Sequence, residues 1–222
     1  MSKPLPSPEE ALDLLQAALS NARRLLDAST VLVEAGHAPP AYSLATLAFE
    51  EIGKAQMCIL AMRRDPRSDT LPSFGPSGEG FWQAWGSHGP KIAFAQAFLT
   101  YAVRATESPG AGVAARLVDR ARGENAQKMR GFYVDFDADG VHTPDEITED
   151  QARQQIADVD AVLVFCERTW CGDDARAKAL ARLGRPAETY ELDARVARAV
   201  EQDPSAAFQQ AKSLFTAATA IE

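Results

Sequence analysis

Cysteine is scarce in this chain, and long apolar runs are missing. Of its 222 residues three are cysteines, Cys58, Cys166 and Cys171, and no two of them have the Cys-x-x-Cys spacing of a zinc or redox site. We therefore expect reduced, structural cysteines, as in a cytoplasmic protein. The N-terminus has no apolar signal region, and no apolar run approaches the roughly 20 residues that cross a bilayer. These absences predict a soluble cytoplasmic protein without a membrane partner.

Positive charge is also in short supply. The chain has 23 Lys and Arg against 31 Asp and Glu, a net charge of −8. This balance disfavours a broad basic surface for nucleic acid but leaves room for a small local basic site. Runs of β-branched residues are scarce, whereas hydrophobic residues, many of them Ala, make up 46%, so a packed helical core is expected. We predict an all-α bundle of about five main helices over residues 1–171 and a helical extension over residues 172–222.

Two helix starts have strong capping signals. In Ser7-Pro8-Glu9-Glu10 the serine can cap, proline occupies the first helical position and Glu10 completes a capping box. Apolar residues then recur with a helical period to about Glu34, and Gly36 and a proline pair end the helix. Thr148-Glu-Asp-Gln151 is a second capping box, which opens a helix to about Cys171.

The stretch from Tyr42 to Met62 predicts the central helix of the bundle. It is rich in Ala and Leu, and Glu51 lies on its apolar stripe. Because a carboxylate on a core face needs a partner, Glu51 either lies at the stripe edge and reaches water or faces a polar pocket inside the bundle. Glu50 lies on the flank, four residues before Lys54, a spacing typical of a solvated ion pair.

The next helix, which opens near Ser87, begins with polar residues on its apolar face. Its stripe runs through Ile92 and Ala95, and extended backwards it passes through Lys91 and His88. A histidine at a helix end often only caps the helix or contacts water. Together with Glu51 on the preceding helix, however, His88 and Lys91 indicate a polar site within the bundle.

A basic helix is predicted from about residue 113 to Tyr133. It ends in Lys128-Met-Arg-Gly-Phe-Tyr133-Val-Asp135, where Arg130, Tyr133 and Asp135 have the side chains to bind an anion or to assist proton transfer. The alternative is a solvated basic face. The residues from Asp135 to Glu146 fit the spacing of a calcium-binding EF-hand loop. A turn rich in Asp and Gly that joins two helices explains the same residues equally well.

Three segments in this order resemble the AbiV family of bacterial abortive-infection proteins, a branch of the HEPN-like helical domains. They are Phe49-Glu-Glu-Ile-Gly-Lys54, His88-x-x-Lys91, and Lys128 to Asp135 followed by Thr143-Pro-Asp-Glu-Ile-Thr148. The resemblance covers roughly residues 10–170. It implies a helical bundle, a homodimer and a role in phage defence. HEPN relatives are often metal-independent ribonucleases with an Arg-x(4–6)-His motif, and no histidine of this chain has that motif.

The first functional hypothesis is a ribonuclease without cofactors. Metal-free cleavage of RNA needs a base, an acid and cations for the phosphate. His88 is the candidate base, and Glu51 orients His88 or a lysine. Tyr133 positions the phosphate or donates a proton. The candidate cations and substrate contacts are Lys91, Arg130, Lys54, Lys128 and Asp135.

Two alternatives belong to other classes of protein. In the first, the chain binds a phage or host protein and blocks a process such as translation, and its polar residues form a buried network that fixes helix register. In the second, Glu50 or Glu51, His88 and Asp135 are ligands of a catalytic metal ion.

Overall fold

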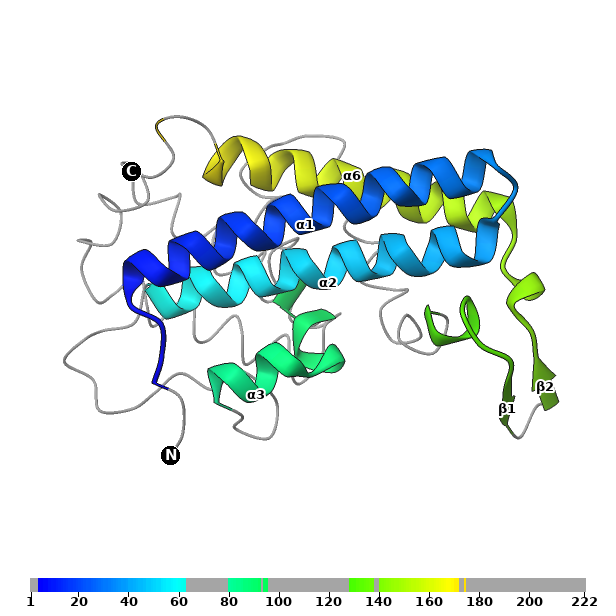
Figure 1. The fold of residues 1–222 in the computed structure, drawn as a ribbon, viewed down its shortest axis with the longest axis horizontal. Coiled ribbons are helices and arrows are strands. Elements are labelled where there is room, and N and C mark those ends of the chain that lie inside the picture. Colours follow the sequence, from blue (N-terminus) through cyan, green and yellow to red (C-terminus); the bar gives the residue numbers. More distant parts are fainter. Residues whose placement is uncertain are drawn as a thin grey trace, which may run out of the picture.

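The computed structural model describes residues 4–62, 80–92, 94–95, 128–137, 140–171 and 174. Its order of elements is α1 (Pro8–Glu34), α2 (Ala38–Met62), α3 (Phe81–Gly86), β1 (Asp135–Asp137), β2 (Gly140–His142), the 3₁₀ turn η1 (Pro144–Glu146) and α6 (Glu149–Trp170). The predicted all-α class is confirmed, because long helices build the bundle (Figure 1). The predicted loop at 65–80 and the helix from about 113 lie largely outside the described residues, as does the extension 172–222, so the division into two domains stays a prediction.

The first two helices form an antiparallel pair (Figure 1). Helix α1 begins as its capping box predicts: the Ser7 hydroxyl accepts from the backbone N–H of Glu10, and the Glu10 carboxylate accepts from that of Ser7. Gly36 has φ +82°, a conformation that glycine adopts without strain, and it lets the chain reverse between α1 and α2.

Helix α6 packs along both members of that pair. Its predicted capping box is present, with the Thr148 hydroxyl accepting from the Gln151 N–H. Arg23 of α1 ties the two helices together, because its guanidinium lies 2.7 Å from Asp160 and 2.7 Å from Glu167 of α6. The apolar core lies between these three helices and is built of Leu, Ala, Met and Phe side chains.

Helix α2 is the centre of the bundle. Of its 25 residues 18 are buried, including Glu50. Helices α1 and α6 cover one side, and α3 lies on the other (Figure 1). On that second side, residues 88–92 and 94–95 are also helical. A helix covered in this way has no wide solvent face, so most of its polar residues, Glu50 among them, are buried.

A short β-ribbon interrupts the helical architecture between residue 130 and α6. Strands β1 and β2 are antiparallel, with Asp135 opposite His142 and Asp137 opposite Gly140. The Glu146 carboxylate accepts from the Thr143 N–H and contacts the His142 ring. Pairing Asp135 with His142 makes a hairpin, whereas an EF-hand would wrap its first and twelfth positions around one ion, so the backbone favours the turn over the calcium loop. Among the described helices, none is long and apolar enough to cross a membrane.

Candidate functional site

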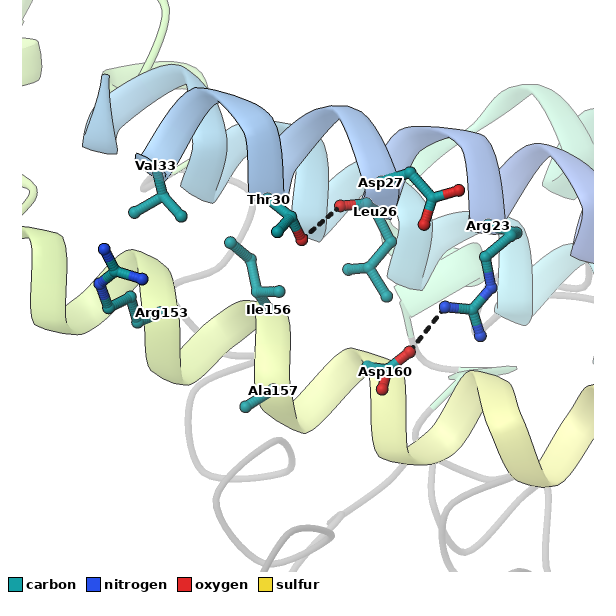
Figure 2. A pocket seen from close by; sticks show the side chains of 9 residues that line it. All are labelled: Arg23, Leu26, Asp27, Thr30, Val33, Arg153, Ile156, Ala157 and Asp160. Carbon is teal, nitrogen blue, oxygen red and sulfur yellow. Dashed lines mark hydrogen bonds and ion pairs between the residues drawn. The ribbon is translucent and has the colours of Figure 1, made fainter. Parts of the chain in front are cut away.

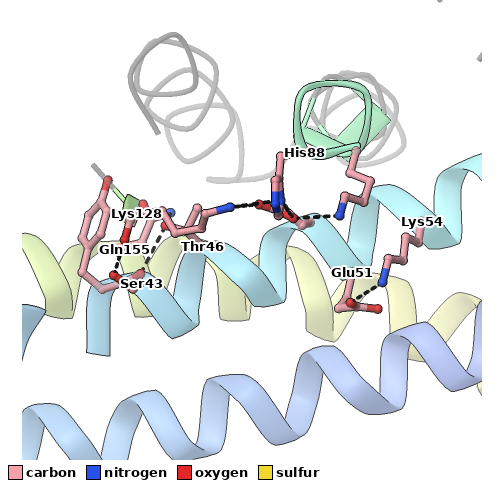
Figure 3. A network of polar contacts seen from close by, with 10 residues as sticks. Ser43, Thr46, Glu51, Lys54, His88, Lys128 and Gln155 are labelled. Carbon is pink, nitrogen blue, oxygen red and sulfur yellow. Dashed lines mark hydrogen bonds and ion pairs between the residues drawn. The ribbon is translucent and has the colours of Figure 1, made fainter. Parts of the chain in front are cut away.

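The most unusual side chain of the bundle is Glu50, which is only 2% exposed at the middle of α2. Its Oε1 lies 2.6 Å from Lys128 Nζ. Its Oε2 lies 2.7 Å from His88 Nδ1 and 3.1 Å from Lys91 Nζ. We call these four residues the Glu50 cluster; Figure 3 shows His88 and Lys128 meeting above α2. Three segments that are far apart in the sequence thus meet at one carboxylate.

The structure corrects the placement of the two neighbouring glutamates. Glu51 does not face the cluster; it forms a 2.6 Å ion pair with Lys54, and their side chains are 14% and 18% exposed. That pair lies apart from His88 (Figure 3), and Lys54 Nζ sits over the Trp85 ring. The predicted pairing of Glu50 with Lys54 is also wrong, because Lys54 pairs with Glu51 and Glu50 has its ion pairs within the cluster. An apolar stripe cannot identify the core face of a helix that is buried nearly all round.

Gly53 explains why the helical segment with His88 and Lys91 reaches Glu50. A Cβ at Gly53 would overlap the backbone carbonyl oxygen of Lys91, so the two backbones approach as closely as only glycine allows. Gly53 is one helical turn after Glu50 and shares its face. This glycine is the sequence signal for the inward face of α2 that stripe periodicity missed.

The segment with Lys128 is held against the start of α2. The Ser43 hydroxyl lies 2.8 Å from the Lys128 carbonyl oxygen, to which it donates. A Cβ at Gly131 would overlap the Ser43 hydroxyl and come within 2.6 Å of the Pro39 carbonyl oxygen. These contacts fix the backbone of residues 128–131, and they direct the Lys128 side chain along α2 to Glu50.

Electrostatics keep Glu50 ionised. Burial alone would raise the pKa of this carboxyl, but the hydrogen bonds from Lys128 and His88 and the charge of Lys91 hold the pKa below its ordinary value of 4.5. The side chains of Lys91 and Lys128 are 8% and 3% exposed, whereas that of His88 is 49% exposed. His88 is therefore the member of the cluster that meets solvent.

The contacts of the His88 ring assign its tautomer. Nδ1 lies 2.7 Å from Glu50 Oε2 and 3.0 Å from Lys128 Nζ. Nδ1 cannot donate to the carboxylate and accept from the ammonium group at once. The shorter contact, to an ionised oxygen, assigns the proton to Nδ1, which donates to Glu50. In the neutral ring the other nitrogen, Nε2, then carries the lone pair.

The remaining predicted site residues lie toward the β-ribbon. The pKa of Glu146, the last residue of η1, is lowered first by its hydrogen bonds to His142 and to the Thr143 N–H, and the charge of Arg130 adds a smaller effect. Tyr133 is exposed, with its ring edge-on to Phe132 at 6.3 Å between centroids. Asp135 opens β1. Of the eight residues predicted from the sequence, His88, Lys91 and Lys128 are the ones that contact Glu50.

The predicted metal ligands do not form a metal cluster in the part of the chain that the structure describes. Within the described parts of the chain, no group of three or more His, Cys, Asp or Glu is arranged to hold a metal ion. A groove of about 330 Å³ lies between α1 and α6, next to the Arg23–Asp160 ion pair (Figure 2). It is separate from the Glu50 cluster, because none of the four cluster residues lines it.

Comparison with known protein families gives a match over most of the chain. The family model described as AbiV matches residues 10–164, a range that contains all four members of the Glu50 cluster. No curated protein and no solved structure matches the chain.

Proposed function

The chain belongs to the AbiV family, and we propose that it is a HEPN-type abortive-infection protein that defends against phage by cleaving RNA at the Glu50 cluster. The observation that carries this proposal is the buried carboxylate against Nδ1 of a half-exposed histidine. A carboxylate in this position orients an imidazole and stabilises the imidazolium that forms when the ring takes up a proton.

The proposed step needs no metal ion. His88 Nε2 removes the proton of a ribose 2′-hydroxyl, and the 2′-oxygen attacks the adjacent phosphorus. The bond from phosphorus to the 5′-oxygen breaks, and that oxygen takes a proton from water, which leaves a 2′,3′-cyclic phosphate and a 5′-hydroxyl. Glu50 does not touch the RNA and acts as a positioning residue. It supplies a fixed carboxylate partner for the histidine of a chain that lacks the Arg-x(4–6)-His motif.

The test is RNA cleavage by the purified protein. We expect His88→Ala to lower the cleavage rate by on the order of 10²–10⁴-fold, the range that a general base contributes. Folded Glu50→Gln protein should also cleave more slowly, because the His88 ring loses its carboxylate partner. Glu51→Gln is the matched control, since it changes the neighbouring carboxyl, and we expect it to retain most of the activity. Folded His88→Ala protein that cleaves RNA at the wild-type rate would exclude the proposed role of His88.

A second candidate function is a non-enzymatic one, in which the chain acts by binding a phage or host protein. The burial of Lys91 and Lys128 favours it, because a closed ionic network also fixes how helices pack. Exposed apolar side chains near the ribbon offer a surface for a partner or for the second copy of a homodimer: Met129, Phe132, Tyr133, Val134 and Val141. Intact RNA together with a partner whose capture is lost in Val134→Lys protein would support this candidate over cleavage.

A further inference from the structure

We infer that the Glu50 cluster is an anion site that accepts one phosphate group. This inference rests on the proposed function only in naming the RNA phosphodiester as the natural ligand. The inference starts from the charges of the cluster, in which one carboxylate, that of Glu50, faces the two ammonium groups of Lys91 and Lys128. Among the described residues both lysines have their ion pair with that same carboxylate. With a neutral His88 the cluster has a surplus of one positive charge.

A surplus charge is costly where the cluster lies. Both lysines are buried, and a buried charge that lacks a full counter-charge loses hydration without equivalent Coulomb energy. Both Glu50 oxygens are already engaged, Oε1 by Lys128 and Oε2 by His88 and Lys91. A bound anion would supply the missing negative charge, and its binding free energy would include the relief of that cost.

His88 marks where the anion binds. It is the half-exposed member of the cluster, and the assigned tautomer directs its Nδ1 inward to Glu50. The anion would lie beside the exposed part of this ring but clear of the Nε2 lone pair, with the two lysines acting through their field, which is weakly screened in a buried site. A phosphodiester carries one negative charge and so matches the surplus of one.

Phosphate binding separates this inference from simple structural packing. We would titrate wild-type protein with inorganic phosphate against chloride at equal ionic strength and follow the ¹H–¹³C signals of the His88 ring. We expect a saturable shift of His88. In Lys128→Met the cluster is neutral, and we expect phosphate to bind about tenfold or more weakly, because one close charge in a poorly screened site is worth at least that factor.

Arg24→Met is the control for overall charge. Arg24 is exposed on α1, and α1 lies on the far side of α2 from His88 (Figure 3), so phosphate binding should be unchanged. Lys91→Met serves as a second neutralising variant if Lys128→Met does not fold. No saturable His88 shift, or equal phosphate affinity in the neutralised and Arg24→Met proteins, would overturn the inference.

Two further measurements identify the source of the phosphate group and test the anion site separately from RNA cleavage. A 2′-O-methyl dinucleotide, which cannot be cleaved by the proposed step, presents a diester, and inorganic phosphate presents the free anion. Binding of the dinucleotide assigns the site to a nucleic-acid backbone, and binding of inorganic phosphate alone assigns it to a free phosphate group. RNA cleavage without phosphate binding would leave the proposed function standing and remove the anion site. Phosphate binding without RNA cleavage would support the anion site and contradict the proposed function.

Discussion

Lys128 and Glu50 are 78 positions apart in the sequence, yet their charged atoms lie 2.6 Å apart inside the bundle. This ion pair joins the segment before the β-ribbon to the middle of the central helix. Both side chains have lost nearly all contact with water. Such a pair is sensitive to the loss of either partner, because the other charge is then left buried.

Removing the Glu50 charge should therefore cost much more stability than removing the Glu51 charge. We expect Glu50→Gln to lower the free energy of unfolding by about 3–5 kcal/mol, because it leaves two buried lysines without an ion-pair partner. Glu51→Gln should cost about 1 kcal/mol or less, since its pair with Lys54 is partly exposed. Urea unfolding measures both, and equal losses in the two variants would contradict the assigned burial.

The stability of the protein should depend on Glu50 in acid. Its pKa is lower in the folded chain than its ordinary value of 4.5, so the folded state favours the ionised form. The resulting stabilisation is fully present above pH 4.5 and is lost as the pH falls through the lower, folded pKa. Unfolding free energies measured from pH 7 to pH 3 should fall more steeply for the wild type than for Glu50→Gln. Parallel curves would show that another group carries the acid dependence.

A methyl group at Gly53 should separate the two helices that build the site. Gly53→Ala would place a Cβ against the Lys91 carbonyl, and we expect a loss of about 1–3 kcal/mol, as in other overpacked interiors. The His88 ring signals should shift because its segment is displaced from Glu50. Gly86→Ala is the matched control, since a Cβ there meets nothing within 4 Å. Wild-type stability and unshifted His88 signals in Gly53→Ala would disprove the close approach.

Arg23 should stabilise the pairing of α1 with α6 through geometry as well as charge. Its guanidinium contacts Glu167 with two nitrogens and Asp160 with a third, and an ammonium group cannot reproduce this fork. We expect Arg23→Lys to lower the free energy of unfolding by about 1 kcal/mol, given that the side chain is partly exposed. Arg24→Lys, a change of the same kind on the exposed face, should have no measurable effect. Equal values for the two variants would show that charge alone suffices.

The helices were predictable because their signals are local. The capping boxes at Ser7 and Thr148 lie within four residues of the helix starts that they define. The β-ribbon was missed because its sequence, rich in Asp and Gly, is equally compatible with a turn or a cation loop. Only the pairing of Asp135 with His142 decides between them.

The site was predictable in part. The polar residues His88 and Lys91 at the head of an apolar stripe indicated a buried site, and both contact Glu50. The choice between Glu50 and Glu51 depended on which side of α2 meets residues 88–95, which is a property of tertiary packing. Gly53 indicates that side, because a Cβ there would overlap the Lys91 carbonyl oxygen. Glycine has no side chain, however, so it does not contribute to the apolar pattern.

The convergence of three distant segments on Glu50 bears on when the cluster can form during synthesis of the chain. A chain still on the ribosome has no complete centre until Lys128 has emerged and packed against α2, so truncated products lack the cluster altogether. Formation of the Glu50 cluster is thereby tied to completion of the fold. Cleavage of the chain between residues 50 and 128 before folding would likewise prevent the cluster from forming.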